Sequence, residues 1–208
     1  VNYAINKDDL VRYDLLGNGK PLATLTMAGE TGHNPELRPY PYDPDKARQL
    51  LKEAGYPEGI RLKGVVKAQG ERTMLIISKQ LEEVGIRLDL HQTTDATVIS
   101  DIRSQNWDFT FGGCPDPMAH SFFIQFIFLS SLSPYSIHRN QAYDRLLQKM
   151  STTLNPVGHV QAGMELDRYI HEEALGIFTY QRIKTFGVKK GVDFVPYATG
   201  MPYFFLTY

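Results

Sequence analysis

The stretch WDFTFGGCPDPMAH, residues 107–120, gathers residue types that often do chemistry in proteins. Cys114 is the only cysteine of the chain, and Asp116 and His120 have the i, i+4 spacing that brings two side chains to one helix face. This stretch is compatible with a metal site, a cysteine nucleophile beside a histidine, or a loop that contacts a ligand. A strand-to-helix turn, in which Asp116 caps a helix at 117–129 and His120 lies on its polar face, is the fourth interpretation.

The number of possible ligands argues against a metal, and the sequence context argues against a catalytic thiol. A dedicated transition-metal site usually needs three or four converging ligands, and the other histidines of the chain show no paired spacing such as HxxxH. No cysteine-hydrolase signature surrounds Cys114, and the chain has no GxSxG, phosphate-loop or dinucleotide motif. We therefore expect no metal, no cofactor and no enzymatic activity.

The composition is that of a globular protein with 208 residues, 42% of them hydrophobic and 22% charged. A net charge of −1 argues against a nucleic-acid partner, because binding to phosphates needs an excess of clustered cations. A single cysteine excludes an intrachain disulfide framework. The most apolar run, FFIQFIFL at 122–129, is too short to cross a membrane.

Helix signals are clearest in YDPDKARQLLKEAGYPEG, residues 42–59. Asp43 is a natural N-cap, Pro44 suits the first helical position, and Gly55 is a typical stop. Residues 1–16 predict a short helix, and LATLTM at 22–27 predicts a short strand.

The middle of the chain predicts a β-α-β-α-β unit, which indicates an α/β fold with parallel strands. Strands are expected at 60–66, 86–92 and 107–112, and helices at 71–85 and 95–105. The last third predicts helices at 140–150 and 157–174, followed by strand-like pieces at 176–181, 185–189 and 202–208.

Ligands of such sheets usually lie outside the carboxyl ends of the parallel strands. Three segments are expected there: 67–73, 92–97 and 112–120. Glycines let a ligand approach the backbone, aromatic rings offer flat apolar walls, and charged groups pair with the ligand. The candidate ligand-binding residues are Phe111, Gly112, Gly113, Cys114, Asp116, His120, Tyr180 and Arg182.

The order of several motifs resembles one known family. VNYAINKDDLV, a proline-rich stretch and YPYDPDKARQLLKEAGYPEGI resemble the family 5 extracellular solute-binding proteins of bacterial ABC importers, which bind peptides, nickel or opines. WDFTFGGCPDPMAHSFF resembles their strand–loop–helix segment with its Asp-Pro, and LDRYIHEEALGIFTYQR resembles their late helix and strand.

The resemblance implies a lobe of the type II periplasmic-binding-protein fold, a mixed sheet with flanking helices. Such proteins have two lobes that close on a solute. Residues 1–190 would form the C-terminal lobe, and residues 191–208 would return toward an N-terminal lobe that lies outside this chain. The implied partners are that lobe, the solute and the permease subunits, and the implied location is periplasmic or extracellular, at the membrane through the transporter.

The resemblance favours a peptide or a small peptide-like solute. In the peptide-binding branch an aspartate of this loop holds the amino terminus of the peptide, and Asp116 is the matching candidate. A nickel or metal-chelate importer protein is the alternative, for which the matching positions are Phe111 and Pro115. A solute-sensing regulatory module is a further alternative, and the sequence preceding the chain would distinguish it.

Overall fold

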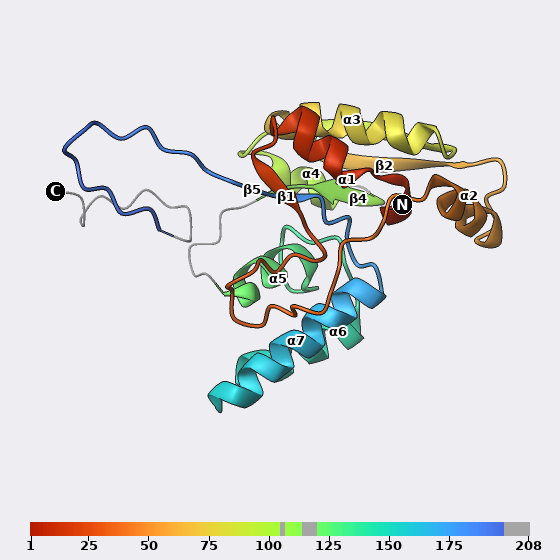
Figure 1. The fold of residues 1–208 in the computed structure, drawn as a ribbon. Coiled ribbons are helices and arrows are strands. Elements are labelled where there is room, and N and C mark those ends of the chain that lie inside the picture. Colours follow the sequence, from red (N-terminus) through yellow and green to blue (C-terminus); the bar gives the residue numbers. More distant parts are fainter. Residues whose placement is uncertain (105–106, 114–119, 198–208) are drawn as a thin grey trace.

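The computed structural model describes residues 1–104, 107–113 and 120–197. Figure 1 shows two parts, one above the other. The upper part contains a sheet with helices α1 (Lys7–Asp9) and α3 (Glu71–Glu82), and the lower part contains helices α5, α6 and α7. The three segments expected to bind a ligand follow strands of this sheet, so their positions depend on the upper part.

The sheet of the upper part is parallel, as the β-α-β-α-β pattern predicts. Strand β2 (Ile60–Lys67) lies between β3 (Ile86–Thr93) and β4 (Phe109–Phe111) and runs parallel to both. The predicted connecting helices are present as α3 and α4 (Val98–Ser104). The α/β class with flanking helices is confirmed.

Helix α2 (Pro44–Glu53) begins where the sequence predicts. The Asp43 carboxylate accepts a hydrogen bond of 2.9 Å from the Lys46 amide, and Pro44 occupies the first helical position. This signal is local, so it does not depend on the rest of the fold.

Two predictions for the first third are wrong in detail. The expected helix at 1–16 is interrupted, because Ile5 is extended between a 3-10 helix at Asn2–Ala4 and α1, which continues into a π-helical turn at Leu10–Asp14. No strand forms at 22–27. A strand lies just before it instead, β1 (Gly19–Pro21), which pairs antiparallel with β5 (Tyr180–Arg182).

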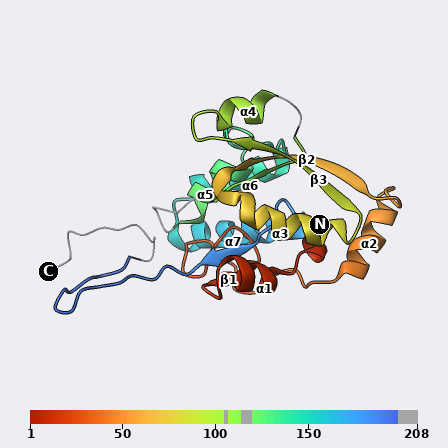
Figure 2. The same cartoon turned by 90° about the horizontal axis from the view of Figure 1, so that it is seen from above.

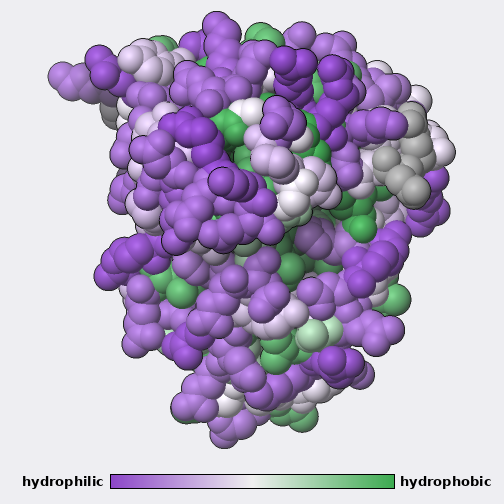
Figure 3. All heavy atoms as spheres, turned by 90° about the vertical axis from the view of Figure 1, so that its right-hand side faces the viewer, coloured by the Kyte–Doolittle hydropathy of each residue, from purple (hydrophilic) through white to green (hydrophobic). Residues whose placement is uncertain are grey.

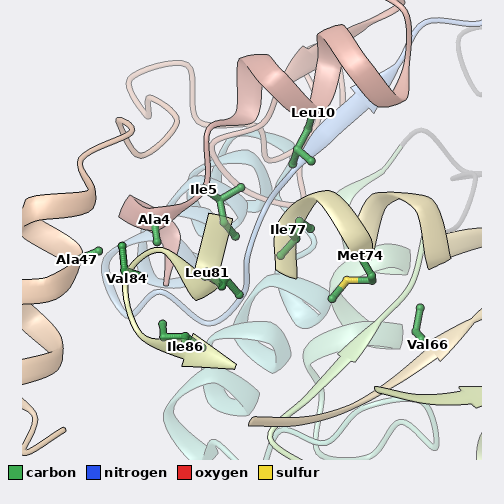
Figure 4. Close-up of a cluster of buried hydrophobic side chains, with 10 residues drawn as sticks. All are labelled: Ala4, Ile5, Leu10, Ala47, Val66, Met74, Ile77, Leu81, Val84 and Ile86. Carbon is green, nitrogen blue, oxygen red and sulfur yellow. The ribbon is translucent and has the colours of Figure 1, made fainter. Parts of the chain in front are cut away.

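The hydrophobic core of the upper part joins the N-terminal segment to α3 and the sheet. Figure 4 shows α3 contributing Met74, Ile77 and Leu81, with Ile5 and Leu10 from the N-terminal segment nearby. This first cluster is completed by Ala4, Ala47, Val66, Val84 and Ile86. The N-terminal segment is therefore an integral part of this core.

The lower part has its own core. Helices α5 (Ser121–Leu129), α6 (Gln141–Thr152) and α7 (Pro156–Glu172) surround Tyr143, Leu147, Met150, Leu166 and Ile170. The two C-terminal helices were expected at 140–150 and 157–174, and both are confirmed.

After β5 the chain leaves the body as an extended arm, residues 183–197 (Figures 1 and 2). The strand expected at 185–189 does not form, and the piece at 202–208 lies outside the described residues. Figure 3 shows the side of the molecule away from the arm, where hydrophilic residues cover most of the surface and hydrophobic ones show in limited areas. Within the described part of the chain, no helix is long and apolar enough to span a membrane.

Lys7 is buried where the N-terminal segment meets the segment that follows β1. Only 4% of the residue is exposed, and its ammonium donates to the Leu22 carbonyl at 3.3 Å and lies 5.6 Å from the centre of the Tyr40 ring. Burial lowers the pKa of Lys7 to about 8. An ordinary lysine titrates near 10.5, so between these values the unfolded chain binds a proton that the folded chain does not.

This difference makes stability depend on pH. We expect the free energy of unfolding to rise by about 2 kcal/mol from pH 7 to pH 9.5, because unfolding takes up a proton in this range. In K7M the rise above pH 8 should largely disappear. Urea denaturation at several pH values measures it, and an equal rise in K7M would contradict this assignment.

Candidate ligand-binding edge

The carboxyl ends of the three parallel strands meet at one edge of the sheet. Lys67 is paired with Thr93, and Val66 with Phe111. The segments 67–73 and 92–97 therefore begin side by side, together with Gly112 and Gly113, as the sequence predicts. We call this the candidate edge.

Phe111 is the last residue of β4, and its half-buried ring packs against the segment that leads into α3. A Cβ atom on Gly70 would lie 2.5 Å from two carbons of this ring, well inside contact distance. Gly70 therefore lets the ring lie against the backbone. The ring of Phe111, which is predicted to form an apolar wall for a ligand, is therefore half-buried and packs against the backbone at Gly70.

Gly112 and Gly113 follow as exposed residues. Phe128 of α5 approaches Gly112, where a Cβ would lie 3.0 Å from its ring, whereas a Cβ on Gly113 would meet no atom of the described residues within 4 Å. Open backbone at Gly113 is suited to close approach by a ligand. Cys114 and Asp116, the next two candidates, lie outside the described residues.

Polar contacts order the segment 92–97. The Thr93 hydroxyl donates to the Asp101 carboxylate at 2.5 Å, and this bond is the main cause that lowers the pKa of Asp101. Lys67, at the end of β2, forms an ion pair with Asp95 across the edge. The ion pair joins the ends of two neighbouring strands.

Tyr180 and Arg182 lie in β5, and both side chains already make contacts within the protein. The Tyr180 hydroxyl donates to the Asp14 carboxylate at 2.5 Å, and burial, followed by this bond, raises the pKa of Tyr180. Arg182 is exposed, with its guanidinium 5.9 Å from the centre of the Tyr180 ring. Their contact with a solute stays a prediction.

Asp14 and Thr73 are polar residues that the sequence did not single out. Thr73 lies in the first turn of α3 and donates to Asp14 at 2.6 Å. Asp14 is 166 residues away from Tyr180 along the chain, so no local pattern could have indicated the contact.

His120 lies next to the start of α5, and its contact with a solute stays a prediction. It is the N-cap of α5, since its Nδ1 accepts from the Phe122 amide at 3.1 Å. Within the described residues α5 begins at Ser121, and the backbone of His120 itself is extended, with φ −141° and ψ 125°, so His120 does not lie on a helix face as the fourth interpretation expected. Its Nε2 lies 2.9 Å from Nε2 of His159 on α7, a pairing that spacing along the sequence did not reveal. In the described ranges, no three His, Cys, Asp or Glu side chains gather as metal ligands would.

The chain matches the family model described as bacterial extracellular solute-binding proteins, family 5 middle, over residues 1–132. The glutathione-binding protein GsiB of Pectobacterium atrosepticum is 34% identical over 93 residues, which are 43% of this chain and 18% of that relative. GsiB of Escherichia coli K12 is 37% identical over 90 residues, 42% of this chain and 17% of the relative. The match thus spans less than a fifth of these relatives.

Solved structures show the same fold. HbpA2 of Haemophilus parasuis has a TM-score of 0.84 at 21% identity and covers 100% of this chain, which corresponds to 43% of HbpA2. The periplasmic binding protein DppA of Helicobacter pylori, solved with the peptide STSA, has a TM-score of 0.73 at 22% identity and covers 88% of this chain and 36% of DppA. The expected periplasmic-binding-protein fold is confirmed.

The contact between Gly70 and Phe111 can be tested by adding one methyl group. We expect G70A to lower the free energy of unfolding by about 1–3 kcal/mol, because the ring of Phe111 has to move out of its place. G113A is the matched control, with an expected change within about 0.5 kcal/mol. Guanidinium denaturation measures both, and equal values for the two variants would show that Gly70 does not hold Phe111.

Proposed function

Because the chain belongs to the family 5 bacterial extracellular solute-binding proteins, we propose that it is the C-terminal lobe of the substrate-binding component of an ABC importer. The family match over residues 1–132 is the observation that carries this proposal. The lobe and an N-terminal lobe would close on the solute, and the closed form would dock on the permease. Capture and delivery need no catalysis by this chain.

The proposed solute is a peptide or a small peptide-like molecule. The relatives at 34–37% identity are named glutathione-binding, and glutathione is a small peptide. A nickel chelate has weaker support, because the likeness to NikA of Brucella suis, with a TM-score of 0.69 at 21% identity, concerns the fold alone. The half-buried ring of Phe111 and the exposed backbone of Gly113 at the candidate edge support this proposal, and Asp116 follows Gly113 by three positions in the sequence.

The proposed division of the chain is a lobe at residues 1–190 and a terminal segment at 191–208 that returns to the N-terminal lobe. The exposed apolar side chains of the arm support it. Val192 and Val195, both in the terminal segment, are 39% and 41% exposed on an arm that extends away from the body (Figure 1). Apolar side chains grouped on an extended segment are typical of a surface that another part of the protein covers.

The proposed place of action is the periplasm or the extracellular face, at the membrane through contact with the permease subunits. This follows from the role of the family as extracellular solute-binding proteins. The N-terminal lobe and the permease are the proposed protein partners.

Binding should require both lobes. We expect the parent polypeptide that includes the N-terminal lobe to bind glutathione or another short peptide with a Kd of about 10 μM or tighter, about −7 kcal/mol of binding free energy. The 208-residue chain alone should bind at least roughly tenfold more weakly, since half of the contacts are absent. Isothermal titration calorimetry with glutathione, a peptide panel and nickel–EDTA measures this.

Two outcomes would overturn the proposal. Tight binding of a peptide by the 208-residue chain would show that closure between lobes is not needed. Binding of the chelate without any binding of peptides by the parent polypeptide would replace the peptide by a metal chelate.

A further inference from the structure

Asp14 ends the N-terminal helical segment, and its carboxylate is enclosed by donors. Only 6% of its side chain is exposed. One carboxylate oxygen accepts from Tyr180 at 2.5 Å and from Thr73 at 2.6 Å, and the other lies 3.7 Å from Nε of Arg72. A buried carboxylate is tolerated only when such groups compensate for the lost water.

The two hydroxyl groups are committed to this carboxylate. The oxygens of Tyr180 and Thr73 are also 3.1 Å apart, but an ionised carboxylate can only accept, so the two contacts with Asp14 each use the single hydrogen of a hydroxyl. Hydrogen bonds to a charged acceptor are stronger than neutral ones. Asp14 is therefore the centre of the contact between β5 and α3.

The contact joins the candidate edge to the beginning of the arm. Thr73 lies in the first turn of α3, directly after the Gly70 backbone that supports Phe111. Tyr180 opens β5, which is held by β1 and by the hydrogen bond from Ile183 to the Asn18 carbonyl at 2.9 Å. Exposed arm residues follow at once.

We propose that Asp14 is a positioning residue that fixes β5 against the first turn of α3 and so sets the direction in which the arm leaves β5 relative to the candidate edge. This inference rests on the proposed function, in which the arm leads to the N-terminal lobe. The arm would then keep a defined orientation relative to the edge when the lobes close. Asp14 itself is not expected to contact the solute.

Hydrogen–deuterium exchange tests the proposal in the 208-residue chain. Y180F removes one hydroxyl and leaves the ring in place, and D14N removes the charge. In both variants we expect the amides of residues 17–20, 22 and 179–184 to exchange roughly tenfold faster, because opening of β1 and β5 no longer has to break a charge-assisted hydrogen bond. The amides of α6 and α7 should be unchanged.

Variants at Thr73 provide a matched pair. T73V removes the donor at nearly constant volume and should speed exchange at β1 and β5, whereas T73S keeps the hydroxyl and should restore rates to within about twofold of the wild type. Unchanged exchange in Y180F and D14N would overturn the proposal. So would an equal increase in α6 and α7, which would mean general loss of stability.

The same variants in the parent polypeptide separate this inference from the proposed function. With glutathione or the tightest peptide of the panel as the probe, Y180F and D14N should raise the Kd roughly fivefold or more, and T73S should not. Unchanged affinity in Y180F and D14N would overturn the positioning role even if the exchange rates change. If the wild-type parent binds no peptide, the proposed function fails, while the exchange experiment still decides whether Asp14 fixes β5.

Discussion

The parallel pairing of β2 with both of its neighbours is the constraint on which the candidate edge depends. Parallel strands need crossover connections, here made through α3 and α4, and these connections bring three carboxyl ends to one side. The pairing is stabilised by burial, since Val65 and Val66 at the centre of β2 are 2% and 1% exposed. A shift of β2 by one residue would turn these side chains to opposite faces and move the segment 67–73 away from Phe111.

Residues 22–43 contain no helix or strand and run between the upper and lower parts. Buried polar contacts hold this segment in place. The Asp167 carboxylate of α7 accepts from the Asn34 amide at 3.1 Å. Burial raises the pKa of Asp167, and hydrogen bonding partly offsets that effect. At Gly163 of α7 the segment passes so closely that a Cβ would lie 2.6 Å from the Cα of Gly32. The hydrogen bond from Asn34 and the two facing glycines allow an irregular chain to pass close to α7 here.

The difference between expectation and structure follows from the range of the interactions. Asp43 caps α2 through the amide of Lys46, three residues away, so its role is visible in the sequence. The alternation at 22–27 suggests a strand, but the residues it buries are Thr24 and Thr26, 1% and 3% exposed, and the Thr26 hydroxyl accepts from Gln125 of α5. The only strand of this region among the described residues is β1, because β5 supplies its pairing from the other end of the chain. Tertiary contacts of this kind override local propensity.

The candidate site shows the same limit. Sequence patterns located the ends of the parallel strands and predicted Phe111 and the glycines after it as walls for a solute, because strand ends and glycines have local signatures. They did not identify the supports, which are Gly70 behind Phe111 and Asp14 behind Tyr180. The supports matter physically, because a wall held in place before the solute arrives loses little conformational entropy on binding. In the proposed importer protein, affinity would therefore depend on buried residues that never contact the solute as well as on those that do.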